Sequence, residues 1–109
     1  MSKSFNLKVS NTRSFSTIYS SPHSGSNYSE EFLAQSILSL KELRSSEDAF
    51  IGELFKIATN YDSAFIEATF PRCFIDLNRS HFELDPKLLQ GDFKYESTPR
   101  NLAGFGVIP

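Results

Sequence analysis

The order of short apolar segments along the chain is the feature that most constrains its fold. Residues 13–20 alternate apolar and small polar side chains and predict a first strand, and residues 63–70 predict a second. A third predicted strand covers 73–77, after the break at Pro71. The strongest helical pattern, at 46–60, lies between the first two strands. This order predicts an α/β layer structure.

The helix predicted over 46–60 combines an apolar face with an N-terminal cap. Ser45 or Ser46 is the predicted cap residue, and the acidic Glu47 and Asp48 follow it. Acidic side chains are favourable there because the first helical turn has free N–H groups and a positive dipole end. The predicted apolar face consists of Phe50, Leu54, Ile57 and Ala58, with Phe55 beside them.

Weaker signals predict the remaining elements. Ser29 is the predicted cap of a short helix over 29–34, and residues 36–43 extend the helical pattern less cleanly. Residues 82–90 predict a turn followed by one helical turn that starts near Pro86.

The two ends of the chain differ in character. Residues 1–12 are polar and predict a flexible arm or an edge segment, which leaves 13–109 as one partial domain. The tail from Gly91 to Pro109 has no regular pattern and ends on apolar residues. We expect such an ending in a chain that belongs to something larger.

Composition restricts the class of protein. A chain of 109 residues fits one small domain, and eleven Phe and four Tyr supply apolar area for its core. The net charge of −2 argues against a nucleic-acid surface, and no apolar run is long enough for a membrane span. Because the N-terminus lacks an apolar signal segment and Cys73 is the only cysteine, we expect a cytoplasmic protein with a reduced, buried thiol.

Polar side chains gather where the third predicted strand ends. Asp76, Asn78 and Arg79 follow one another closely there, and ligand sites of α/β sheets usually lie at the carboxyl ends of strands. Arginine can bind a carboxylate with two parallel hydrogen bonds. The cluster therefore indicates a pocket for a small carboxylate, or else a loop arginine in a surface ion pair with Asp76.

One histidine and one aspartate are candidate metal ligands. His23 lies in a turn after the first predicted strand, where it is either a ligand or base, or an exposed turn residue. Asp48 is either an acid of the helix cap or a ligand. Together they could supply two of the three protein ligands of a catalytic zinc, although manganese and iron accept the same donors. His81, the other histidine, is expected to be a solvated loop residue.

Six motifs occur together and in order along the chain. They are Pro22-His23-Ser24-Gly25 with Tyr28 after it, Leu43 to Phe50, Phe70-Pro71-Arg72, Asp76-Leu77-Asn78-Arg79, Glu83-Leu84-Asp85-Pro86, and Ala103 to Pro109. With these motifs the chain resembles the N-formylglutamate amidohydrolase family of zinc hydrolases over nearly its whole length after residue 15. The resemblance implies the N-terminal portion of a three-layer, mixed-sheet α/β fold of the zinc-carboxypeptidase-like (phosphorylase/hydrolase-like) kind, in incomplete form.

The resemblance also implies an activity and roles for individual residues. The implied reaction is hydrolysis of N-formyl-L-glutamate to formate and glutamate, with a zinc ion that activates water. By resemblance, His23 and Asp48 are zinc ligands. Asn78 and Arg79 are the clamp for a carboxylate of the substrate, a small acyl amino acid, and Arg72 is a second cationic contact.

Part of the family pattern is missing from this chain. Members of the family continue beyond the GFGVIP segment, and a later His-Ser-Met-Pro-like motif supplies a third zinc ligand. The acid or base of the reaction is not identified either, and Glu47 is only a nominee. We therefore expect a fragment that is inactive alone. The alternatives are a non-catalytic remnant of a truncated gene, and one half of a split enzyme whose other half is a separate C-terminal polypeptide.

Overall fold

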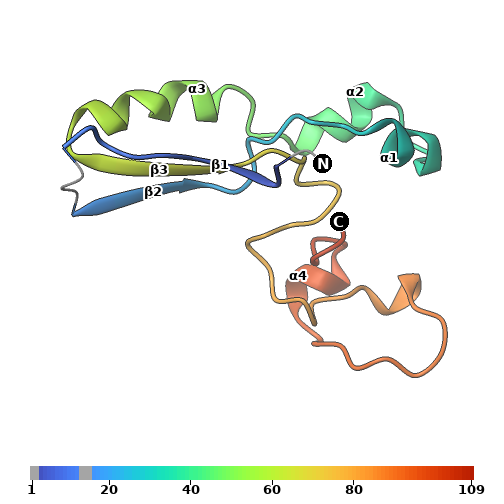
Figure 1. Ribbon diagram of the computed structural model, residues 1–109. Coiled ribbons are helices and arrows are strands. Elements are labelled where there is room, and N and C mark those ends of the chain that lie inside the picture. Colours follow the sequence, from blue (N-terminus) through green and yellow to red (C-terminus); the bar gives the residue numbers. More distant parts are fainter. Residues whose placement is uncertain (1–2, 13–15) are drawn as a thin grey trace.

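A three-stranded mixed sheet forms one end of the molecule (Figure 1). The computed structural model describes residues 3–12 and 16–109. The strands are β1 (Phe5–Lys8), β2 (Thr17–Ser21) and β3 (Ser63–Ala68), and β3 lies in the centre. β1 runs antiparallel to β3, whereas β2 runs parallel to it. The chain is thus an α/β protein as predicted.

The register assigns the strand residues to two faces. Phe65 of β3 lies opposite Lys8 of β1 and Tyr19 of β2, so these three side chains share one face. Phe65 is only 3% exposed. The predicted strand 63–70 is confirmed over its first six residues, where a run of apolar side chains suits a central strand.

One short helical segment covers the Phe65 face of the sheet. α3 (Ile51–Phe55) continues as the 3₁₀ turn η2 (Lys56–Asn60), and the rings of Phe55 and Tyr19 pack with centroids 5.8 Å apart. Gly52 is buried on the same side, where its missing side chain makes room for the Glu67 carboxylate.

The predicted apolar face of this helix is wrong. Phe50, Leu54 and Ile57 are 79%, 67% and 58% exposed, so this stripe faces solvent. The helix begins at Ile51 instead of 46, and the residues that face the sheet include Gly52 and Phe55. The predicted residue Phe55 thus does contact the sheet, through Tyr19, while the buried Gly52 allows the helix to approach the strands closely.

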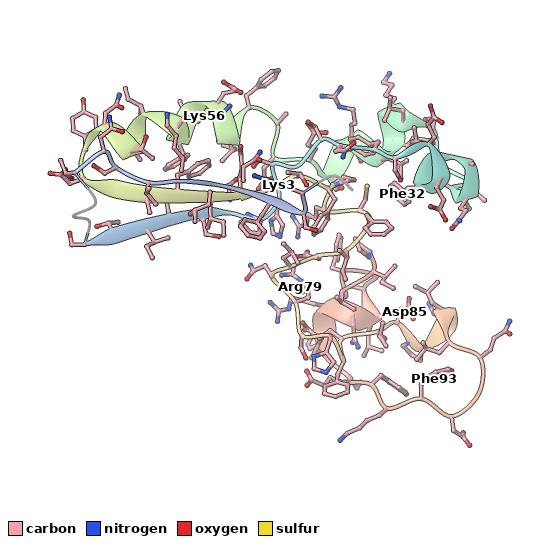
Figure 2. All side chains as sticks on the ribbon, viewed as in Figure 1. Lys3, Phe32, Lys56, Arg79, Asp85 and Phe93 are labelled. Carbon is pink, nitrogen blue, oxygen red and sulfur yellow. The ribbon has the colours of Figure 1, made fainter. Side chains whose placement is uncertain are left out.

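The opposite face of the sheet carries no helix (Figures 1 and 2). Phe5 and Leu7 of β1 and Ile18 of β2 lie on it by register, and each is more than half exposed. The described residues therefore form two layers, and the third layer of the fold that the resemblance implied in incomplete form is not among them. No helix within 3–12 and 16–109 is long and apolar enough to cross a membrane.

Two capped helices lie beyond the carboxyl ends of β2 and β3 (Figure 1). The prediction of a short helix capped by Ser29 is confirmed, because α1 (Glu30–Gln35) begins there and the Ser29 hydroxyl accepts from the Phe32 N–H. The segment 36–43 is helical only in α2 (Leu40–Leu43), which starts at a capping box formed by Ser39 and Glu42.

The serines predicted to cap the 46–60 helix have a different role. Ser45 and Ser46 belong to the 3₁₀ turn η1 (Arg44–Ser46), where their hydroxyls donate backwards to the carbonyls of Glu42 and Leu43. The prediction fails because hydroxyls near a helix end can bond either to free N–H groups ahead or to carbonyls behind.

The third predicted strand is also wrong. Residues 73–77 form turns, with the Phe74 N–H donating to the Pro71 carbonyl and the Asp76 N–H donating to the carbonyl of Val107. A distant part of the chain therefore satisfies the backbone where a sheet neighbour was expected. An apolar run of this length does not distinguish a strand from a buried turn.

The residues from 77 to 109, here called the C-terminal lobe, contain only short helices. η3 (Pro86–Leu88) confirms the helical turn predicted near Pro86. α4 (Pro99–Leu102), capped by Thr98, was not predicted. At the other end of the chain, Phe5–Lys8 form an edge strand that pairs with β3. Of the two alternatives predicted for residues 1–12, this strand fits the edge segment and not the flexible arm.

Two glycines offer a matched test of this packing. A side chain at Gly25 would collide with the backbone carbonyl of Phe70, whereas one at Gly52 would meet only the movable end of Glu67. We expect Gly25→Ala to lower the free energy of unfolding by about 1–3 kcal/mol, because backbone must shift. We expect Gly52→Ala to be neutral or stabilising by up to about 1 kcal/mol, because alanine favours the helix. Urea unfolding measures both, and equal losses would contradict the packing described.

Candidate functional site

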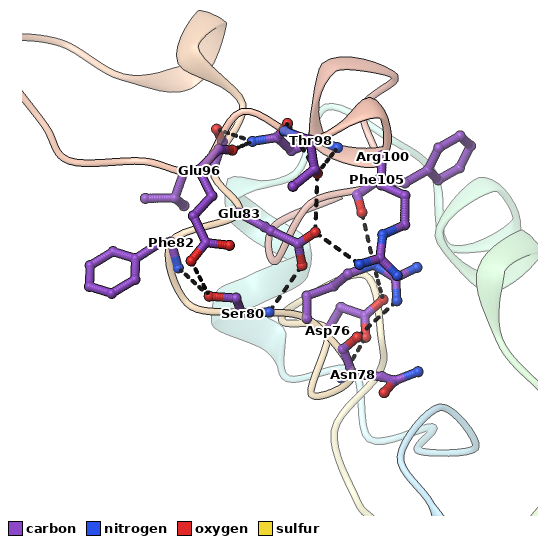
Figure 3. Close-up of polar contacts among 12 residues, drawn as sticks. Asp76, Asn78, Ser80, Phe82, Glu83, Glu96, Thr98, Arg100 and Phe105 are labelled. Atoms are coloured by element: carbon purple, nitrogen blue, oxygen red, sulfur yellow. Dashed lines mark hydrogen bonds and ion pairs between the residues drawn. The ribbon is translucent and has the colours of Figure 1, made fainter.

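The carboxylate of Asp76 is the centre of the polar cluster between the sheet and the C-terminal lobe. Its side chain is 1% exposed. Oδ1 bonds to His23 Nε2 at 2.8 Å and accepts from the Asn78 N–H at 2.8 Å, and Oδ2 accepts from Arg72 Nε at 2.9 Å. Figure 3 shows the contact with Asn78. A buried carboxylate needs such partners to offset the loss of hydration.

These partners also set the charge of Asp76. Burial by itself would raise the pKa of the carboxyl, but the Asn78 N–H, the His23 ring and the charge of Arg72 outweigh it and hold the pKa of Asp76 below its usual range. Asp76 is therefore ionised at neutral pH and can accept a hydrogen bond from the imidazole.

His23 lies two residues after β2, at the carboxyl end of the parallel strands. Its side chain is 11% exposed, and its Nε2 is hydrogen-bonded to Asp76. When Nε2 donates its proton to Asp76, the lone pair of the neutral ring lies on Nδ1. Nδ1 lies 3.7 Å from Oδ2 of Asp48, which is too long for a hydrogen bond.

The distance between His23 and Asp48 suits a shared cation. With bonds of about 2.0–2.2 Å, two ligands of one tetrahedral zinc ion lie roughly 3.4 Å apart. The Asp48 carboxylate is half-exposed, and the Asp48 N–H donates to the His23 carbonyl at 3.0 Å. The two sequence-predicted ligands are thus neighbours, and their donor atoms fit zinc.

The helix-cap interpretation of Asp48 is wrong. η1 ends at Ser46 and α3 begins at Ile51, so Asp48 lies in the loop between them. The carboxylate therefore has no helix terminus to cap. Within the part of the chain that the structure describes, no group of three or more His, Cys, Asp or Glu side chains could hold a metal ion.

The predicted substrate residues lie around Asp76. Arg72 binds Asp76 through Nε, and neither of its terminal nitrogens has a partner among the described residues. Arg79, in the C-terminal lobe (Figure 2), donates from Nε to the Phe105 carbonyl at 3.0 Å and from Nη1 to the Asn78 carbonyl at 2.9 Å. The Asn78 side chain is exposed. The alternative of an ion pair between a loop arginine and Asp76 is confirmed for Arg79, whose Nε lies 3.9 Å from Oδ2, but the pair is not at the surface, because the two side chains are 10% and 1% exposed.

Sequence reasoning missed the segment that fixes Arg79 and Asp76. The carbonyls of Phe105 and Val107 accept from these two residues, and the Val107 N–H donates to the Glu83 carbonyl. Gly106 lies between them, and any side chain there would collide with the same Glu83 carbonyl. The Gly-Phe-Gly sequence was the available signal for such a close approach.

The surroundings of the remaining candidate residues do not indicate a catalytic role for them. His81 is exposed and stacks on Phe82, as expected for a loop histidine. Cys73 is free and half-buried, and burial raises the pKa of its thiol, which disfavours a nucleophilic role. Glu47, the nominee for acid or base, is held by Tyr28 and Arg44.

A second buried carboxylate, Glu83, holds the C-terminal lobe together (Figure 3). It accepts from the Ser80 N–H at 3.0 Å, the Thr98 hydroxyl at 3.1 Å and Arg100 Nη2 at 3.1 Å. Burial would raise the pKa of Glu83, but these donors and the charge of Arg100 lower it below its usual range.

The lowered pKa of Glu83 predicts acid sensitivity. The unfolded chain binds a proton at Glu83 at a higher pH than the folded chain, so this stabilisation is complete above the ordinary glutamate pKa and is lost as pH falls through the folded value. We expect Glu83→Gln to lower the urea midpoint at about pH 7, with the difference from wild type shrinking towards about pH 3. The exposed Asp92→Asn is the control. A constant difference across this range would contradict the assignment.

Known proteins resemble this chain in sequence and in fold. The profile of the N-formylglutamate amidohydrolase family matches residues 15–109. The crystal structure of N-formylglutamate amidohydrolase from Ralstonia eutropha JMP134 superposes with a TM-score of 0.86 and 28% sequence identity, over 95% of this chain. The chain spans 37% of the length of that protein. A search of curated proteins finds no significant match. Because the family profile covers nearly the whole sequence, this chain belongs to the N-formylglutamate amidohydrolase family.

Proposed function

We propose that the chain supplies part of a zinc-dependent site that hydrolyses N-formyl-L-glutamate to formate and glutamate. The observation that carries the proposal is the pair of acceptors His23 Nδ1 and Asp48 Oδ2, which face each other at 3.7 Å. Membership of the family supports the reaction, and the spacing supports a metal ion as the shared ligand.

Zinc is the ion that we assign to His23 and Asp48. When bound, zinc polarises an amide carbonyl and lowers the pKa of a water molecule. Asp76 would keep the proton of the imidazole on Nε2 and thereby hold Nδ1 ready as a ligand. A carboxylate behind a ligating histidine also raises the basicity of the ring.

Arg72, Asn78 and Arg79 are proposed to hold the carboxylate of the substrate. The terminal nitrogens of Arg72 and the exposed side-chain amide of Asn78 are available to donate hydrogen bonds to it. Arg79 donates to the Phe105 carbonyl, and its Nε lies 3.9 Å from Oδ2 of Asp76. These contacts would fix the position from which its guanidinium binds the substrate carboxylate. A substrate with two carboxylates, such as N-formyl-L-glutamate, suits more than one cationic contact.

The third metal ligand and the acid or base are proposed to come from a further polypeptide segment. Two observations support this: the described residues contain no group of three or more side chains that could hold a metal ion, and this chain covers only 37% of the solved relative. The same segment would cover the open face of the sheet and complete the three layers of a zinc-carboxypeptidase-like fold. The free thiol of Cys73 supports a cytoplasmic location.

Zinc titration by calorimetry tests the metal site. We expect the wild-type chain to bind zinc weakly, His23→Ala and Asp48→Asn to lose binding, and Asp76→Asn to weaken it by about 10–100-fold. His81→Ala is the matched control and should bind like wild type, because His81 is exposed and its ring contacts Phe82. Equal titration curves for wild type and His23→Ala would overturn the metal assignment and favour a non-catalytic chain.

Formate release tests the reaction. We expect none from the isolated chain, because a missing acid or base alone costs about 10²–10⁴-fold in rate. We expect release when the chain is combined with the part of the Ralstonia eutropha protein that it does not cover, and loss of that release in His23→Ala. Formate release by the isolated chain, abolished in His23→Ala, would show that no further segment is needed.

A further inference from the structure

The carboxylate of Glu47 is buried next to the candidate metal ligand, yet the proposed function does not use it. Its side chain is 5% exposed. Oε2 accepts from the Tyr28 hydroxyl at 2.8 Å, and the Arg44 guanidinium binds the same carboxylate through Nε at 3.2 Å and Nη2 at 3.3 Å. A buried charge with this many donors fixes the backbone that carries it.

Glu47 is joined directly to Asp48 by an extended stretch of backbone. Glu47 has φ −75° and ψ 130°. These angles are close to those of polyproline II, which has three residues per turn, so successive side chains point in different directions. The Glu47 side chain points to Tyr28 and Arg44, while the Asp48 side chain points to His23, so anchoring Glu47 helps to fix the direction of Asp48.

The Asp48 carboxylate has little else to hold it. It is half-exposed, and among residues 3–12 and 16–109 no hydrogen-bond donor contacts it other than the more distant His23 ring. Its position depends on the loop backbone, through the bond from the Asp48 N–H to the His23 carbonyl and the bond from the Ile51 N–H to the Asp48 carbonyl.

That loop also contains an unfavourable conformation. Phe50 has φ 65° in the left-handed region, which is a real outlier for a bulky residue. Its ring is 79% exposed, so burial of the ring does not compensate. A strained turn persists only when surrounding contacts impose it, and such turns concentrate at functional sites. In this loop, Glu47 accepts a hydrogen bond from Tyr28 and forms an ion pair with Arg44.

We propose that Glu47, held by Tyr28 and Arg44, is a positioning residue that keeps the Asp48 carboxylate opposite Nδ1 of His23. This inference rests on the proposed metal site. It assigns to Glu47 a role in forming the site, in place of the acid or base role for which it was nominated.

Two readouts on the full chain test the proposal. The first needs no metal: amide hydrogen exchange at the Asp48 N–H, compared with the amides of β3. The second is zinc affinity by calorimetry. Tyr28→Phe removes only the hydroxyl. We expect it to speed exchange at Asp48 by at least about tenfold relative to β3, and to weaken zinc binding by about tenfold.

Control and second variants separate positioning from folding. Tyr61→Phe changes an exposed tyrosine of the same kind and should alter neither readout. Arg44→Gln removes the other partner of Glu47 from a half-exposed position and should act in the same direction if Tyr28→Phe does not fold. A merely structural role would accelerate the amides of β3 and Asp48 equally.

The outcomes separate this inference from the proposed function. Zinc binding that is lost in His23→Ala but unchanged in Tyr28→Phe and Arg44→Gln would overturn the positioning role and leave the metal site standing. Equal zinc curves for wild type and His23→Ala would overturn the metal site and the positioning role together. Selective exchange at Asp48 with tenfold weaker zinc binding in either variant is the supporting result.

Discussion

One buried carboxylate, that of Asp76, connects the end of the sheet to the C-terminal lobe. Asp76 binds His23 from the end of β2, Arg72 from the preceding turn and the Asn78 N–H from its own loop. Its N–H donates to Val107 near the end of the chain. Removing a charge from water is costly, so the carboxylate is stable only with all of these donors in place. The sheet, the turns after it and the final residues consequently depend on one another.

Local signals in the sequence were sufficient where a side chain acts on its own neighbourhood. The hydroxyl of Ser29 and the ring of Pro86 each mark the start of a helical turn, because capping and a fixed φ act within three residues. The prediction of a strand over 73–77 failed because the Phe74 N–H donates to the nearby Pro71 carbonyl, while the Asp76 N–H donates to the carbonyl of the distant Val107. The stripe of Phe50 and Leu54 failed because tertiary packing, not periodicity, decided which face of α3 meets the sheet.

In the candidate site, too, the sequence predicted some residues, whereas others could be found only from the structure. The residue types of His23 and Asp48 indicated a metal pair from sequence, and the family motifs strengthened that hypothesis. The loop that separates Asp48 from the helix, the orientation of the imidazole by Asp76, and the burial of Glu47 depend on contacts between distant segments. No pattern of adjacent residues encodes such contacts. Family resemblance therefore indicated His23 and Asp48 as candidate ligands, while the structure was needed to find the residues that contact and orient them.

The uncovered faces of the α/β layers have a consequence for the behaviour of the chain in solution. Large apolar side chains are exposed on the segment that comprises Phe50, α3 and η2, namely Phe50, Leu54 and Ile57. Others are exposed on the open side of the sheet, namely Phe5, Leu7 and Ile18. A net charge of −2 gives copies of the chain little mutual repulsion. Colloidal stability is therefore governed by how much apolar surface a neighbour covers, and adding salt to screen charge changes it little.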